Sequence, residues 1–154
     1  MAYQISTGLR NILLGSAAAA SATSASLSTA MNLGFLMIYA GSVPASADAA
    51  LGGATLLCQV SNASGATGLT LDAPASGVIP KNSSEVWSGV NVATGTAAFF
   101  RWVAAGDDGT LSTTQARIQG LVGTLGSDMN LSSVSLTSGA TQTIDTFNWT
   151  LPTY

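Results

Sequence analysis

Histidine is absent from this 154-residue chain, and cysteine occurs once, at Cys58. Without histidine the chain lacks the commonest general base and metal ligand of proteins, and neither a Ser-His-Asp nor a Cys-His catalytic set can form. A single cysteine also excludes an internal disulfide. Because Cys58 lies in the apolar run 54–60, we expect a small buried core residue rather than a reactive thiol.

Charge is scarce as well. Charged residues make up 7% of the chain and the net charge is −3, whereas ordinary soluble domains contain roughly 25% charged residues. The four basic residues are Arg10, Lys81, Arg101 and Arg117, which are scattered along the chain. They form no basic stripe for nucleic acid and no electrostatic membrane anchor. The surface must therefore be built from small and neutral polar residues, which suits packing against other protein.

Long uninterrupted apolar runs are also missing. No charged residue occurs between Asn11 and Ala47, but serine, threonine, asparagine and glycine interrupt this stretch throughout, which argues against a transmembrane helix. Arg10 followed by residues 11–20 has the outline of a secretory signal peptide. The single basic residue and the short, alanine-dominated apolar stretch argue against that alternative.

Residues 7–20 instead predict a helix with Ser6 or Thr7 as its N-cap. Alanine and serine continue to about residue 25, which gives either a helical arm or a flexible spacer. We therefore divide the chain into an N-terminal arm, residues 1–30, and a β-domain, residues 31–154. The candidate partner-contact residues of the arm are Leu9, Ile12, Leu13 and Leu14.

The remainder of the chain predicts short strands separated by glycine-containing turns. The apolar segments 33–41 and 54–60 indicate buried strands. Residues 94–104 give the strongest strand signal, and Asp107-Asp108-Gly109 is a hairpin-turn sequence that leads to a partner strand at 114–122. Segments 128–132, 134–136 and 141–151 alternate in polarity. We expect a mainly β fold, an antiparallel β-sandwich or small barrel, preceded by the short helical arm.

Alternation across the predicted hairpin assigns side chains to faces. Phe99, Arg101 and Val103 would point one way from their strand. Arg101 and Arg117 would lie near each other across the hairpin, either diagonally or sharing an acidic partner.

The residues that could carry chemistry are few. Asp107 and Asp108 are the only adjacent acids; paired carboxylates serve glycoside hydrolysis or bind Ca²⁺, but their position before a glycine favours the turn. Lys81, the only lysine, precedes two serines in an expected solvated loop. Residues 120–126 contain spaced glycines without the Lys-Ser/Thr of a phosphate-binding loop. We assign no catalytic, cofactor-binding or metal-binding residue and predict that the protein is not an enzyme.

The three tryptophans, Trp87, Trp102 and Trp149, leave two interpretations open. Exposed, they would form a platform for a sugar ring, as in a carbohydrate-binding module. Buried, they would anchor the core of the β-domain, which is the interpretation we favour.

A series of motifs covers most of the chain in order: Ile-Ser-Thr-Gly-Leu-Arg-Asn (5–11), Leu-Met-Ile-Tyr-Ala-Gly (36–41) leading into Pro44 and Ala-Asp-Ala (47–49), Leu-Leu-Cys (56–58), Trp-Ser-Gly-Val (87–90), Thr-Gly-Thr-Ala (94–97), Phe-Arg (100–101), Asp-Asp-Gly (107–109), Ser-Thr-Thr-Gln-Ala-Arg-Ile-Gln-Gly (112–120), Asp-Met-Asn-Leu (128–131) and Gln-Thr-Ile-Asp-Thr-Phe (142–147). Together these motifs resemble a family of small structural proteins of tailed bacteriophages. Relative to that family, residues 16–28 look like an insertion. The family offers no catalytic residues to carry over.

The resemblance implies a virion component without a cofactor. The leading expectation is a capsid decoration, or cement, protein on the capsid surface, acting as a homotrimer that contacts the major capsid protein or other virion proteins. The alternatives are a tail, baseplate or fibre component and, in a different class, a carbohydrate-binding module. If residues 1–30 are a separate arm, their deletion should leave a folded domain.

Overall fold

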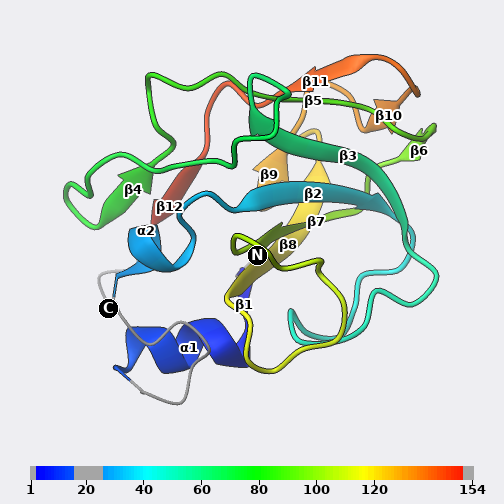
Figure 1. Cartoon of the computed structure of the whole chain (residues 1–154). Coiled ribbons are helices and arrows are strands. Elements are labelled where there is room, and N and C mark those ends of the chain that lie inside the picture. The colour runs from blue at the N-terminus through cyan, green and yellow to red at the C-terminus, as the bar shows by residue number, and fades with distance from the viewer. Residues whose placement is uncertain (1–2, 16–25, 151–154) are drawn as a thin grey trace.

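The computed structural model describes residues 3–15 and 26–150, and it confirms the expected mainly β architecture with antiparallel sheets (Figure 1). The elements in chain order are β1 (Gln4–Ile5), α1 (Thr7–Leu13), α2 (Leu27–Ala30), β2 (Phe35–Ala40), β3 (Thr55–Asn62), β4 (Val78–Pro80), β5 (Trp87–Val90), β6 (Gly95–Thr96), β7 (Phe99–Val103), β8 (Arg117–Gly123), β9 (Met129–Asn130), β10 (Ser135–Leu136), β11 (Thr141–Thr143) and β12 (Asn148–Thr150).

One large sheet organises the molecule, with strand order β1-β8-β7-β2-β3-β5-β11 and β9 attached to β8. The β8–β9 pair is parallel, and the other pairs of described strands are antiparallel. Two further sheets have two strands each, β10–β6 and β12–β4. Among the described strands the large sheet stays open between β1 and β11, so the architecture is sandwich-like rather than a closed barrel.

The inner face of the large sheet carries the main hydrophobic core. Side chains of a strand alternate between faces, so Phe100 and Trp102 of β7 point inward together with Ile38 of β2. Against this face pack residues of both helices, of the two small sheets and of the segment before β12. These packing residues are Leu9, Ile12, Leu27, Leu136, Ile144, Phe147 and Trp149.

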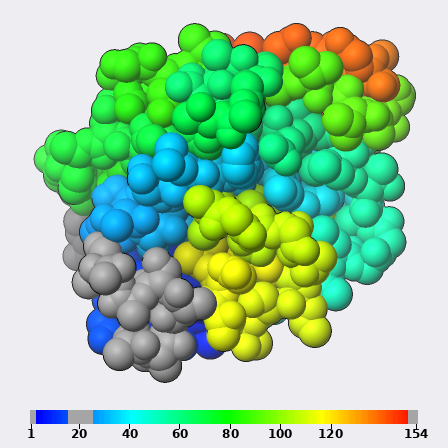
Figure 2. Space-filling model, viewed as in Figure 1, coloured from blue at the N-terminus to red at the C-terminus, as the bar shows by residue number. Residues whose placement is uncertain are grey.

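The outer face of β2 and β7 carries a second, smaller apolar cluster of Met37, Tyr39, Phe99 and Val103. In Figure 2 the yellow-green connection between β7 and β8, residues 104–116, lies across the front of the molecule. The β2–β3 connection, residues 41–54, lies beside it in cyan. These two connections shield the outer face, and they position the polar groups described below.

Two predicted strands are interrupted. The segment 94–104 divides into β6 and β7, and the segment 141–151 divides into β11 and β12, which belong to different sheets. The antiparallel pairing of β7 with β8 is confirmed, but the connection is the long segment 104–116 rather than a tight hairpin turn.

The predicted N-terminal helix is confirmed at its start. Ser6 is the N-cap, and its hydroxyl accepts a hydrogen bond from the Leu9 backbone N–H. The helix ends at Leu13, earlier than residue 20; residues 16–25 lie outside the described part. No helix in residues 3–15 and 26–150 is long and apolar enough to cross a membrane.

Candidate functional site

The adjacent acids Asp107 and Asp108 have separate structural tasks. Asp107 accepts two hydrogen bonds of 2.6 Å from the Arg117 guanidinium, and both side chains are buried. The Asp108 carboxylate instead accepts from the backbone N–H and the hydroxyl of Thr110, and these hydrogen bonds lower its pKa. The Asp107 carboxylate also accepts from Gly109 N–H, so both acids bind backbone N–H groups of their own loop. In the described residues no three Cys, Asp or Glu side chains gather into a metal-binding group.

Arg101 is fully buried on the outer face and forms five hydrogen bonds, which matches the five N–H donors of a guanidinium. Two go to the Gln119 side-chain oxygen, and three go to the backbone carbonyls of Ser46, Ala49 and Gly109. Burial, and then the nearby Arg117 charge, lower the pKa of Arg101. The guanidinium therefore ties the connections 41–54 and 104–116 to the sheet.

Arg101 and Arg117 lie diagonally across β7 and β8, as predicted. Arg101 is opposite Gln119, and Val103 is opposite Arg117. Arg117 has the acidic partner Asp107, whereas the guanidinium of Arg101 bonds to the Gln119 amide oxygen and to backbone carbonyls. Because both guanidinium groups are buried, half of the four basic residues are unavailable to an external phosphate.

The isolated nucleophile candidates are in unreactive surroundings. Cys58 is fully buried in the main core, and burial raises the pKa of its thiol to about 11, so the expectation of a core residue is confirmed. The Lys81 ammonium donates to the backbone oxygens of Glu85 and Asn82, at 2.7 and 3.3 Å, and lies near the Trp87 ring. The Lys81 ammonium therefore bonds to backbone oxygens and not to a serine hydroxyl.

The three tryptophans are buried, as favoured from the sequence. Trp87 and Trp102 meet edge to face with ring centroids 5.5 Å apart, and both contact Phe147. The ring centroids of Trp149 and Tyr3 are 4.3 Å apart. None of the three therefore offers an exposed ring face for stacking on a sugar.

The four candidate partner-contact residues divide into two pairs. Leu9 and Ile12 are buried in the main core with residues of the β-domain, so they are already occupied within the chain. Leu13 is 38% exposed and Leu14 is 85% exposed. The structure therefore leaves Leu13 and Leu14 as the accessible pair.

The start of α1 is fixed by polar contacts that the sequence did not reveal. The Asp48 carboxylate accepts from the backbone N–H of Thr7, at 2.9 and 3.1 Å, and from its hydroxyl at 2.7 Å. The Ser6 hydroxyl donates to Gln115 O and accepts from the Arg117 backbone N–H. A lone aspartate in a loop carries no signal for this role, because its partner is 41 positions away.

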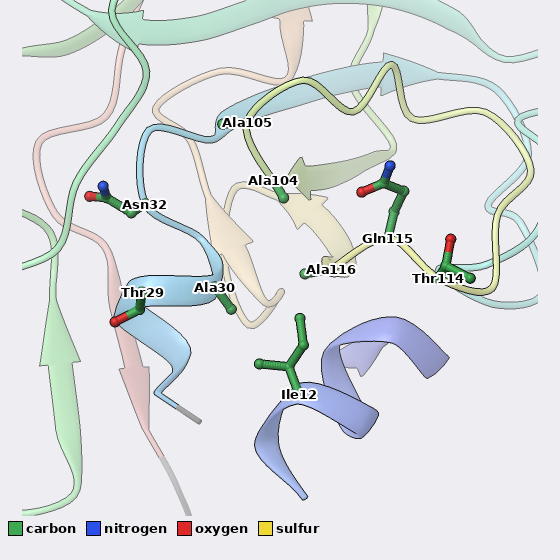
Figure 3. Close-up of a pocket in the computed structure, with 9 residues that line it drawn as sticks. All are labelled: Ile12, Thr29, Ala30, Asn32, Ala104, Ala105, Thr114, Gln115 and Ala116. Atoms are coloured by element: carbon green, nitrogen blue, oxygen red, sulfur yellow. The ribbon is translucent and has the colours of Figure 1, made fainter. Parts of the chain in front are cut away.

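A hollow of about 360 Å³ lies between α1, α2 and the β7–β8 connection. Figure 3 shows Ile12 of α1 and Ala30 of α2 pointing into it, opposite Ala116. The described residues that line it are uncharged: Ile12, Thr29, Ala30, Asn32, Ala104, Ala105, Thr114, Gln115 and Ala116. With Leu13 and Leu14 at the end of α1, this hollow forms what we term the helix corner. Such a surface suits contact with another protein rather than with a charged ligand.

Comparisons with models of protein families, with curated proteins and with solved structures give no match to this chain.

Proposed function

We propose that the chain is a non-enzymatic structural virion protein of a tailed phage, most specifically a capsid decoration (cement) protein. It would sit on the capsid surface as a homotrimer and stabilise the shell through contacts with the major capsid protein or other virion proteins. The observation that carries this proposal is the helix corner, where Ile12 lines an uncharged hollow and the exposed Leu13 and Leu14 follow Ile12 in the chain.

The chemistry of the helix corner supports a protein partner. An exposed leucine gains roughly 1.5–3 kcal/mol when a partner buries it fully, and a neutral lining imposes no desolvation of charge. The hydroxyl and amide groups around the hollow can hydrogen-bond a partner backbone. The sequence resemblance to phage structural proteins supplies the virion context for such a partner.

The experiment compares two variants, each with one exposed leucine replaced by serine, by counting copies of the protein on isolated particles of the encoding phage. Leu14→Ser removes an apolar side chain from the helix corner, and Leu125→Ser removes an equally exposed one, 89% exposed, after the far end of β8. Leu14→Ser should lower the number of copies per capsid, and Leu125→Ser should not. Equal occupancy for both variants and wild type would remove the helix corner from the proposal.

The location is tested by gold labelling and negative-stain microscopy. Label on the shell agrees with the decoration protein, whereas label confined to the tail, baseplate or fibres selects the alternative structural role. Deletion of residues 1–30 is no longer a suitable test, because it would remove the core side chains Leu9, Ile12 and Leu27. Point variants keep the core intact.

A further inference from the structure

The large sheet ends at β11, and in the described part of the chain no strand pairs with the outer side of β11 (Figure 1). The hydrogen bond from Ile144 N to Trp87 O fixes which residues of this segment face β5. Hydrogen bonding in an antiparallel pair alternates along the strand. Thr141 and Thr143 therefore direct their backbone N–H and C=O groups away from β5, and both residues are exposed.

This edge lacks most of the features that prevent strands from pairing with other chains. Protective edges carry lysine, proline, a bulge or an inward charge, or are very short. β11 consists of Thr141, Gln142 and Thr143, without a charge or proline, and its register with β5 is regular. The Gln142 side-chain amide donates to Thr143 O at 2.9 Å, so one outward carbonyl is capped by a side chain that can be displaced. Shortness is the protective feature that remains.

We propose that β11 pairs with β11 of a second copy of this chain, antiparallel about a two-fold axis at Gln142. In this register Thr141 of one protomer lies opposite Thr143 of the other, and the reciprocal pair is equivalent. Both pairs fall at hydrogen-bonded positions, so the outward backbone groups of the two edges satisfy each other. Gln142 meets Gln142 of the partner subunit at the non-hydrogen-bonded position between them.

The charge pattern favours a second copy as the occupant. The residues of β11 are uncharged, so two copies meet without repulsion. Asp145 is the nearest acid along the chain after β11, and in this register it lies opposite Gly139 of the partner subunit rather than opposite another acid. The identical edge is therefore complementary to itself in hydrogen bonding and brings no like charges opposite each other.

Three residues a side bury less than the ~1,000 Å² expected of a stable interface, so the contact is weak and forms where copies are concentrated. A two-fold contact of this kind can form an isolated dimer or join copies from neighbouring trimers. The proposed pairing of β11 with β11 does not depend on the proposed function.

Cysteine cross-linking tests the register. Residues at a non-hydrogen-bonded pair have Cα atoms about 4.5 Å apart, which lies within the range for a disulfide. Gln142→Cys should therefore give a reducible covalent dimer on oxidation at high protein concentration. Thr143→Cys is the matched control and should stay monomeric, because its partner position is Thr141. Cys58 is buried and does not compete. Equal cross-linking of both variants, or none of Gln142→Cys, would overturn the proposal.

Charge substitution tests the contact without a covalent bond. Thr141→Lys with Thr143→Lys places like charges opposite each other in both pairs, whereas Thr141→Glu with Thr143→Lys places opposite charges there. Sedimentation velocity of wild type should show a sedimentation coefficient that rises with concentration. The double-lysine variant should lose this rise and the Glu/Lys variant should keep it, with circular dichroism verifying both folds. Identical sedimentation of the two variants would refute the pairing.

Discussion

Replacing Asp107 with alanine should strongly destabilise the protein, because it removes one member of a buried ion pair. Arg117 donates to both Asp107 oxygens, and the two side chains are 1% and 2% exposed. Removing one member of a buried ion pair costs about 3–5 kcal/mol, because the remaining charge stays buried without its counter-ion. The same substitution also removes a negative charge from the surroundings of Arg101, a second buried cation near Arg117. Since native proteins are stable by roughly 5–15 kcal/mol in total, this loss is a large fraction.

Urea denaturation followed by tryptophan fluorescence measures the effect. With a slope of about 2 kcal/mol per M, the transition midpoint of Asp107→Ala should fall by roughly 1.5–2.5 M. Asp108→Ala is the matched control, because Asp108 is exposed and bonds to Thr110, close in the chain; its midpoint should stay near that of wild type. Asp107→Leu combined with Arg117→Met removes both charges and should recover most of the loss. A midpoint for Asp107→Ala within about 0.5 M of wild type would refute the reasoning, because it would mean that Arg117 is hydrated.

Three further predictions concern the core and the close contacts of α1. Leu9→Ala, in the main core, should lower the free energy of unfolding by about 2–5 kcal/mol, whereas Leu14→Ala should change it by less than about 0.5 kcal/mol; urea midpoints measure both. Gly8→Ala should also destabilise, although alanine is the better helix former, because the new Cβ would meet the backbone oxygens of Thr114 and Gln115; Gly53→Ala has no such neighbour. The Cys58 thiol should react slowly with a disulfide reagent at pH 8 and quickly in urea. The pKa of Cys58 in the folded protein, about 11, exceeds the ordinary value of 9.0, so the thiol of the unfolded chain loses its proton first. The contribution of this thiol to the free energy of unfolding should therefore be complete below pH 9 and decline as the pH rises towards 11.

Each of these predictions has an outcome that contradicts it. Equal midpoints for Leu9→Ala and Leu14→Ala would mean that α1 does not contribute its apolar face to the core. A stabilised Gly8→Ala variant would mean that α1 lies farther from the β7–β8 connection. If the stability of a Cys58→Ala variant falls between pH 9 and 11 as steeply as that of wild type, the fall is caused by other titrating groups.

The sequence predicted which face of its strand each side chain occupies, because the alternation of side chains along a strand is a local property. Phe99 and Val103 lie in the outer cluster and Phe100 and Trp102 in the main core, as their positions predicted. The breaks at residues 97–98 and 144–147 could not be predicted in the same way. They occur where the chain leaves one sheet for another, and sheet membership depends on pairing between distant segments.

The candidate site shows the same limit. An apolar face on a helix indicates that the face is buried but does not say against what. For Leu9 and Ile12 the partner is the β-domain of the same chain, and not a neighbouring protein as expected from an N-terminal arm. Leu13 and Leu14, at the end of the helix, are exposed. The hollow beside them is formed by three separate segments and leaves no sequence pattern.

The pairing of β1 with β8 has a consequence for how the chain acquires its structure. Gln4 lies opposite Gln119, 115 positions away, and Ser6 is bonded to Arg117. The first turn of α1 is therefore held both by Asp48, 41 positions after Thr7, and by residues 115–117, more than 100 positions after Ser6. Contacts between residues so far apart in the sequence are slow to form, so α1 can take its final place only once β8 is positioned to receive it.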